Sequence, residues 1–153
     1  MQKRYYYSYK EFLEDVPKLY NKIQGFNPDS IIAISRGGLT PSHYLAILFN
    51  IRKVYTINSI FYEDQKRFPN IRVDFSFELK EEIKKILIVD DIVDTGKTAK
   101  EVLEILKDKY PKKEFKLATI FYKLNSPILP DFALKEANKW IDFFWEVDLK
   151  GIN

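Results

Sequence analysis

Acidic and hydroxyl side chains gather after one short apolar run of the sequence. Asp90 and Asp91 follow residues 86–89 directly, and a third acid, Asp94, precedes Thr95-Gly96-Lys97-Thr98. The glycine permits a tight backbone, and the hydroxyls and N–H groups at a helix start are donors that suit a phosphate. The adjacent acids would repel a bare phosphate but suit sugar hydroxyls or a Mg²⁺ ion that contacts phosphate oxygens. We therefore predict a site for a phosphorylated sugar with a metal ion.

Three other interpretations of this stretch are weaker. The nucleotide P-loop also ends in Gly-Lys-Thr, but it needs a glycine five residues before Gly96, where this chain has Asp91. Phosphorelay receiver domains carry an acid pair after their first strand, whereas several predicted strands precede the pair here. A purely structural role, in which the acids cap a strand and solvate a turn, requires three acids and a glycine turn to meet at one strand end by coincidence.

The elements that must position these residues alternate between strands and helices. Strands are predicted at residues 30–34, 53–58, 86–89 and 115–122, with helices between them. This order predicts an α/β fold with an open, mainly parallel sheet flanked by helices. Ligands of such sheets lie beyond the carboxyl ends of the strands. A second unusual loop, Ser35-Arg36-Gly37-Gly38, falls at this same edge.

Local signals mark the helix ends. Ser8 and Glu11 form a capping box ahead of an apolar helical face, and Pro17 predicts a kink or an interruption within that helix. Thr40-Pro41 predicts the N-cap and first residue of a helix that reaches about residue 49. Residues 60–78 mix aromatic and charged side chains, which predicts an excursion from the main sheet.

Composition limits the class of protein. The 153 residues are 46% hydrophobic and 16% aromatic, enough for one core, so we expect a single domain over residues 1–153. With 25 basic and 22 acidic residues, the formal charge of +3 does not favour nucleic-acid binding. The absence of cysteine excludes disulfides and thiolate metal sites. No segment predicts a membrane span or a signal peptide, so we expect a cytoplasmic protein.

The stretch ILIVDDIVDTGKT resembles the phosphoribosyl diphosphate (PRPP) signature of the type I phosphoribosyltransferases. Together with IIAISRGGLTP it is similar to the bacterial and archaeal xanthine-guanine branch of that family, and ATIFYK and KWIDFFWEVDL complete the order of motifs. The resemblance spans nearly the whole chain. It implies the type I phosphoribosyltransferase fold, with a small hood region at about residues 59–78 and a C-terminal segment at about residues 131–153.

The resemblance also implies how PRPP is bound. Arg36 and Gly37 would bind its pyrophosphate, in a loop that often carries a non-proline cis peptide bond in this family. Asp90 and Asp91 would contact the ribose hydroxyls and organise Mg²⁺, with Asp91 on the metal side. The 5'-phosphate would be held by Asp94, Thr95, Gly96, Lys97 and Thr98, of which Lys97 stands where related bacterial enzymes commonly have glycine. Asp94 would also relay a proton at N7 of the purine, so Asp94 and Arg36 are the expected catalytic residues.

The expected purine site comes from the C-terminal third of the chain. By the resemblance, Lys123 would donate to the 6-oxo group, Trp140 would stack on the purine, and the backbone of Ile141 would hydrogen-bond its far edge. From the residues alone, Lys123 is equally well a solvated lysine at a strand end. Core packing is the expected role of the other aromatic residues in this segment, Phe143, Phe144 and Trp145.

The hood loop is expected at residues 62–72. Arg67 is the basic residue expected to meet the pyrophosphate there, with Lys66 and Arg72 as alternatives in register. Closure of this loop would exclude water, a competing nucleophile. His43, the lone histidine, receives no chemical role.

The activity that the resemblance implies is Mg²⁺-dependent transfer of the phosphoribosyl group of PRPP to N9 of a 6-oxopurine. The acceptors would be guanine, xanthine or hypoxanthine, and the products a nucleoside monophosphate and pyrophosphate, in purine salvage. The family implies a homodimer or homotetramer. The alternative is a regulator of the same fold that binds PRPP or a nucleotide without turnover, although no DNA-binding domain or strongly basic face accompanies the fold.

Overall fold

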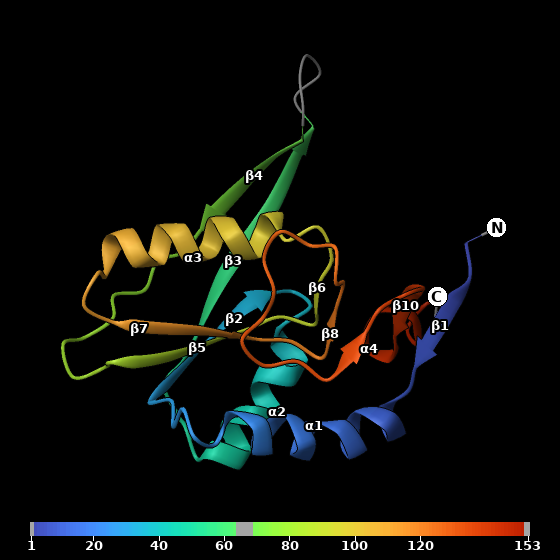
Figure 1. Cartoon of the computed structure of the whole chain (residues 1–153), viewed down its shortest axis with the longest axis horizontal. Coiled ribbons are helices and arrows are strands. Elements are labelled where there is room, and N and C mark those ends of the chain that lie inside the picture. Colours follow the sequence, from blue (N-terminus) through green and yellow to red (C-terminus); the bar gives the residue numbers. More distant parts are fainter. Residues whose placement is uncertain (1, 64–68, 152–153) are drawn as a thin grey trace.

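A five-stranded sheet with strand order β4-β3-β2-β5-β7 is the centre of the fold. The computed structural model describes residues 2–63 and 69–151 (Figure 1). The parallel strands are β2 (Ser30–Ser35), β3 (Val54–Glu63), β5 (Lys85–Val89) and β7 (Glu114–Ala118), and β4 (Pro69–Asp74) is an antiparallel edge strand. The predicted open, mainly parallel α/β sheet is confirmed. No helix in the described ranges is both long and apolar enough to cross a membrane.

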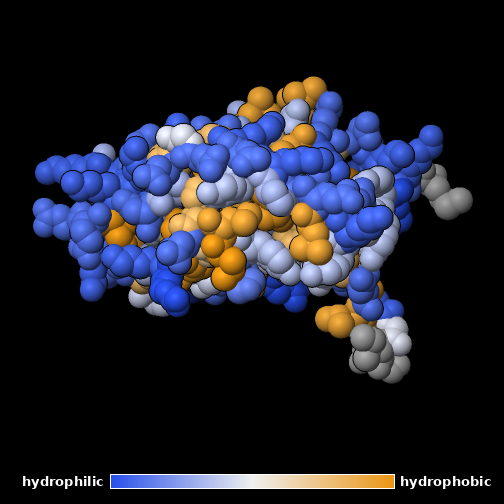
Figure 2. Space-filling view, turned by 90° about the horizontal axis from the view of Figure 1, so that it is seen from below, coloured by the Kyte–Doolittle hydropathy of each residue, from blue (hydrophilic) through white to orange (hydrophobic). Residues whose placement is uncertain are grey.

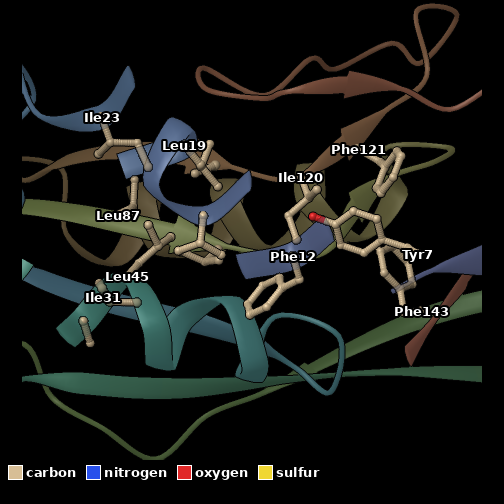
Figure 3. Packing of buried hydrophobic residues seen from close by; sticks show 14 of the residues in the cluster. Tyr7, Phe12, Leu19, Ile23, Ile31, Leu45, Leu87, Ile120, Phe121 and Phe143 are labelled. Carbon is tan, nitrogen blue, oxygen red and sulfur yellow. The ribbon is translucent and has the colours of Figure 1, made fainter. Parts of the chain in front are cut away.

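Helices cover both faces of this sheet. Figure 1 shows α1 (Tyr9–Ile23) and α2 (Leu39–Phe49) on one face and α3 (Lys97–Lys109) on the other. Two buried apolar clusters fill the two interfaces. Figure 3 shows the first cluster, in which Phe12 and Leu19 of α1, Leu45 of α2 and Leu87 of β5 pack together. The expected helix–sheet–helix layering therefore follows from burial of apolar faces on both sides of the sheet.

The start of α1 is confirmed, but the helix is not interrupted at Pro17, one of the two effects predicted for that residue. The Glu11 N–H donates to Ser8 Oγ over 3.1 Å and the Ser8 N–H donates to Glu11 Oε2 over 3.0 Å, which completes the capping box. The helix runs on through Pro17 to Ile23 without interruption. Pro17 lies on the exposed face, where water can serve the carbonyl left without a donor, while the buried face packs as a continuous apolar stripe.

The start of α2 is earlier than predicted. Gly38, not Thr40, is the N-cap, and its N–H donates to the Ile34 carbonyl over 2.8 Å. A Cβ at Gly38 would lie 2.2 Å from the Val89 carbonyl oxygen and 2.7 Å from that of Ile34. The backbone of the turn after β2 therefore packs directly against the carbonyl groups of the sheet, which only glycine allows. The helix begins at the next residue, Leu39.

The predicted strand over residues 115–122 is two strands. β7 ends at Ala118, and β8 (Phe121–Tyr122) belongs to a three-stranded sheet of order β6-β8-β9, with β6 (Ile92–Val93) and β9 (Lys135–Glu136). The N–H groups of Ile120 and Phe121 both donate to the Asp91 carbonyl over 3.1 Å. This contact turns the chain out of the main sheet, a long-range effect that the local apolar pattern does not contain.

One strand pair extends the main sheet, and another forms a separate two-stranded sheet. β3 continues through Glu63, beyond the predicted residues 53–58, and pairs with β4 as an arm that projects past α3 in Figure 1. The prediction that residues 60–78 leave the main sheet is wrong for residues 60–63 and 69–74, because β3 continues and β4 pairs along its edge within that sheet. At the other side, β1 (Arg4–Tyr7) pairs in parallel with β10 (Trp140–Phe143), which leads into the short α4 (Phe144–Val147).

A buried polar network ties this side to α1. Asp15, only 3% exposed, accepts a hydrogen bond from the Tyr7 hydroxyl over 2.8 Å and lies 2.8 Å from Nζ of Lys135. Burial and the neighbouring carboxylate of Asp15 raise the pKa of Tyr7 far above its ordinary value. The network therefore links β1, α1 and β9 through one carboxylate whose charge is compensated by Lys135.

Candidate active site

The two unusual loops meet at the carboxyl ends of β2 and β5. These strands are neighbours, with Ala33 opposite Val89, so the loops that follow them emerge side by side. A Cβ at Gly37 would lie 2.3 Å from Asp91 Oδ2, which places the carboxylate against the backbone of the first loop. Gly37 therefore lies where no larger residue fits unless Asp91 moves.

The first loop presents a cation beside a cavity. The peptide bond between Ser35 and Arg36 is cis, as the family resemblance implies, and Ser35 Oγ donates to Asn58 Oδ1 over 2.5 Å. Arg36 and Gly37 line a cavity of about 540 Å³ together with Glu146 of α4. No acid whose side chain the structure describes (residues 2–60 and 71–151) lies within ion-pairing distance of Arg36. Its guanidinium is available to an anionic ligand.

Burial and neighbouring carboxylates disfavour the ionised forms of the acid pair in the second loop. Burial raises the pKa of Asp91 to about 6; a hydrogen bond with Asp90 opposes this shift and the charge of Glu146 adds to it. Burial and the charge of Asp91 raise the pKa of Asp90 well above its ordinary value. Bringing a divalent cation to these carboxylates would favour their ionised forms, so the site suits a hard cation.

The donor set fits Mg²⁺ in particular. In the described part of the chain, no group of three or more histidine or acidic side chains is placed to hold a metal ion. Mg²⁺ keeps several waters and is usually bound by one or two carboxylates plus substrate phosphates. Asp91, next to a loop suited to phosphate, would supply this kind of partial coordination.

The loop after the acids has the geometry of a phosphate site. Gly96 has φ of +79°, and a Cβ there would lie 2.5 Å from Ser126 Oγ and from Ile128 Cγ2. The 13-residue helix α3 begins at Lys97; its N-cap Gly96 has no side chain to cap it, and the Lys97 N–H makes only a long, 3.4 Å hydrogen bond to Thr95 Oγ1. A hollow of about 320 Å³ is lined by residues 90–99, among them all of the predicted phosphate-binding residues. Free N–H groups at a helix start favour an anion there. Lys97 does not disturb the start of the helix.

Lys123 lies at this loop although it comes from a distant part of the chain. Its Nζ is 2.6 Å from Asp94 Oδ1, and its N–H donates to the Val93 carbonyl over 3.0 Å. It also lines a cavity of about 570 Å³ with Glu136 and Asn138. The structure thus brings together the residues expected at the 6-oxo group and at N7, and Lys123 is not simply a solvated lysine.

The other expected purine residues lie on β10. Trp140 is 46% exposed, whereas Ile141 is buried and its backbone is opposite Tyr5 in the β1/β10 ladder. No hydrogen bond or cation–π contact joins Trp140 to Lys123 in the described residues. Trp145 stacks on Phe143 with ring centroids 4.7 Å apart, so the core role expected of these rings is confirmed.

Some site residues were missed or fall outside the described residues. Glu146, which lines the same cavity as Arg36, was not identified from the sequence. The one feature of the sequence that could have indicated a role for Glu146 is its position within the motif KWIDFFWEVDL. Arg67 and Lys66, two of the three hood candidates, lie outside the described residues. Arg72, the third, lies on β4, and its Nε is 2.8 Å from Asp74 Oδ1.

Comparison with known proteins defines the class. Residues 8–151 match the family model described as "Phosphoribosyl transferase domain", so the chain belongs to the phosphoribosyltransferase family and is an enzyme of the transferase class.

Within this family the chain is similar to purine enzymes. It is 31% identical to a xanthine-guanine phosphoribosyltransferase of Cereibacter sphaeroides, over 99% of this chain and 92% of that protein. The Helicobacter pylori xanthine-guanine-hypoxanthine phosphoribosyltransferase structure matches with a TM-score of 0.92 and 38% identity, covering 98% of each chain. A Pyrococcus horikoshii purine phosphoribosyltransferase matches with a TM-score of 0.81 and 33% identity, covering 93% of each. The resemblance to the xanthine-guanine branch is confirmed.

Proposed function

We propose that the chain transfers the 5-phosphoribosyl group of PRPP to N9 of guanine, xanthine or hypoxanthine, with Mg²⁺, in purine salvage. The observation that carries this proposal is the 2.6 Å ion pair between Lys123 and Asp94. It puts a cation suited to a 6-oxo group at the loop suited to the ribose 5'-phosphate. A 6-amino purine offers Lys123 a donor instead of an acceptor, so the same contact favours oxopurines over adenine.

Each loop has a separate task in this reaction. The C1–O bond to pyrophosphate breaks and the C1–N9 bond forms, through an oxocarbenium-like transition state. Residues 94–98 hold the 5'-phosphate, while Arg36 and the Gly37 N–H bind the leaving pyrophosphate. Mg²⁺, when held beside Asp91, would supply positive charge to the pyrophosphate oxygens.

The purine is positioned from the other side. Lys123 leaves Asp94 to donate to the 6-oxo group, Trp140 stacks on the ring, and the Ile141 backbone binds the far edge. Release from Lys123 leaves the Asp94 carboxylate free to accept the proton that the purine loses at N7.

Product formation tests the proposal. PRPP, Mg²⁺ and each of guanine, xanthine, hypoxanthine, adenine and a pyrimidine are incubated with the protein, and nucleotide is measured by chromatography. We expect nucleoside monophosphate and pyrophosphate with the oxopurines and little product with adenine or the pyrimidine. Binding of PRPP or nucleotide without product, across metal and pH conditions, would instead support the regulator.

The proposed homo-oligomer has a candidate surface on α2. This helix contains no acidic residue, lysine or arginine, yet Ile47 is 69% exposed and Leu39 and Leu48 are 42% and 41% exposed. Figure 2 shows apolar residues gathered in the middle of the face seen from below in Figure 1, the side of α1 and α2. A helix that is apolar nearly all round is usually buried on all sides. A second copy covering α2 would bury this surface.

We expect Ile47→Lys to lower the oligomer mass in solution, because it puts a charge in the centre of this face. Light scattering coupled to size-exclusion chromatography measures the mass. Leu129→Lys, at a site 52% exposed outside α2, is the matched control and should leave the mass unchanged. An unchanged mass for Ile47→Lys, or a monomeric parent protein, would remove α2 as the interface.

A further inference from the structure

The N-terminal strand places a cation over the exposed tryptophan of β10. In the β1/β10 ladder Arg4 is opposite Trp140, and the backbone N–H of Trp140 donates to the Lys3 carbonyl over 3.1 Å. The guanidinium carbon of Arg4 lies 5.8 Å from the centre of the Trp140 ring. This distance is within the range of a cation–π contact, for which tryptophan is the best partner among the aromatic residues.

Asp142 holds this guanidinium in place. Arg4 Nε donates to Asp142 Oδ2 over 2.7 Å and Nη2 donates to Oδ1 over 2.5 Å. The planar guanidinium and the carboxylate therefore form a bidentate ion pair. Asp142 comes two residues after Trp140 on one strand, so both side chains leave the same face of β10. The Asp142 carboxylate and the Trp140 indole therefore both contact the guanidinium of Arg4.

Fold stability alone does not account for this arrangement. The side chain of Arg4 is 58% exposed, and an exposed ion pair contributes little to stability. The ladder of β1 and β10 already joins the two strands without these side chains. The contact restricts the motion of an indole that is 46% exposed. A stacking platform benefits from such order, because less side-chain freedom is lost when a ligand binds.

We propose that Arg4 and Asp142 clamp one face of Trp140 and orient the indole, so that a purine stacks on its other face. Arg4 is then a positioning residue for the base, supplied by the N-terminal strand. This inference rests on the proposed function, since it assigns Trp140 to the purine. It adds a requirement that neither the phosphate loop nor Lys123 supplies.

Tryptophan fluorescence isolates the predicted contact. Trp145→Phe leaves Trp140 as the only tryptophan of the chain, and it breaks no hydrogen bond of the described residues because Trp145 Nε1 has no partner. In this background, GMP is titrated against fluorescence, and calorimetry gives the affinities for GMP and for ribose 5-phosphate. Ribose 5-phosphate lacks the base, so it reports on the phosphate loop alone.

Arg4→Met keeps much of the length of the side chain but removes its positive charge and the guanidinium N–H groups that pair with Asp142. We expect GMP to bind about three- to tenfold more weakly, with less quenching of Trp140, and ribose 5-phosphate to bind as before. In turnover, KM for guanine should rise by a similar factor, while KM for PRPP and kcat change less than about twofold. Asp142→Asn should act in the same direction, and Arg4→Lys should recover part of the loss.

The matched control is Arg52→Met, an exposed arginine between α2 and β3, which should change neither affinity. Equal weakening of GMP and ribose 5-phosphate, or a loss wholly explained by a lower melting temperature, would show a structural role and overturn the proposal. Tighter GMP binding by Arg4→Met would also overturn it, since Arg4 would then occupy the stacking face. If the parent protein makes GMP but both Arg4→Met and Asp142→Asn leave KM for guanine unchanged, the clamp fails while the function stands. If no nucleotide forms at all, the function itself fails.

Discussion

Asp91→Asn is expected to lower kcat/KM for PRPP roughly a hundredfold, a loss of about 2.7 kcal/mol of transition-state stabilisation, and to weaken the dependence of the rate on Mg²⁺. The side chain lies against Gly37, where the two ligand loops meet. Asp91 would hold the metal ion, which would supply positive charge to the leaving pyrophosphate. Asparagine keeps the shape but loses the charge. Steady-state rates at varied PRPP and Mg²⁺, with direct titration of Mg²⁺ by calorimetry, measure the effect.

The same substitution should raise the melting temperature of the ligand-free protein at pH 7.5. Because the pKa of Asp91 in the fold, about 6, lies above the ordinary value of 3.8, the folded state binds this proton more tightly than the unfolded chain. Its contribution to stability is therefore present at low pH and is lost as pH rises through 3.8 to about 6. The gain from asparagine should accordingly shrink as pH falls toward 5.

A control and a contrary result complete this test. Asp108→Asn, an exposed acid near the end of α3, should change neither the kinetics nor the pH dependence of melting. Unchanged kinetics together with a lower melting temperature for Asp91→Asn would assign the acid to a structural cap and remove it from the metal site.

Prediction from sequence succeeded where the signal was local. The capping box of Ser8 and Glu11 satisfies backbone groups within one turn, so the start of α1 follows from four consecutive residues. The two ligand loops could also be predicted from the sequence, because they are rich in glycine, acidic and hydroxyl residues. The alternation of strands and helices places both loops at one edge of the sheet. The family resemblance and the α/β fold are confirmed, while the individual roles of the site residues stay predictions.

Prediction failed where a distant contact decides the conformation. The end of β7 depends on the Asp91 carbonyl, which accepts the N–H groups of Ile120 and Phe121. Nothing in the apolar pattern of residues 115–122 encodes that acceptor. Glu146 and Arg4 resemble ordinary surface charges in the sequence, and only α4 and β1 bring them to the candidate site. Their importance comes from tertiary structure rather than from residue type.

Lys123→Met is the substitution that separates an oxopurine enzyme from a general PRPP binder. It removes the ammonium but keeps much of the side-chain volume. If Lys123 donates to the 6-oxo group, kcat/KM for guanine should fall about tenfold to a hundredfold, as expected for a hydrogen bond to a charged group of about 1.5 to 3 kcal/mol. The affinity for PRPP should barely change.

The ion pair with Asp94 requires a second substrate in this experiment. Lys123 and Asp94 have side chains 33% and 48% exposed, so losing the pair should cost little stability. Freeing Asp94 from its partner can still alter proton transfer at N7, and that effect falls on every purine alike. 2-Aminopurine lacks the 6-oxo acceptor but retains N7 and N9. The ratio of the losses for guanine and 2-aminopurine therefore isolates the bond to the 6-oxo group.

The expected result is a large loss for guanine and a much smaller loss for 2-aminopurine. Asp94→Asn is the matched comparison: it breaks the same ion pair from the other side and should slow both substrates by similar factors. Equal losses on both substrates with Lys123→Met, or a loss confined to PRPP affinity, would move Lys123 out of the base pocket. Selection for an oxopurine would then depend on the β10 residues Trp140 and Ile141, because the remaining proposed contact, Asp94 at N7, is the same for every purine.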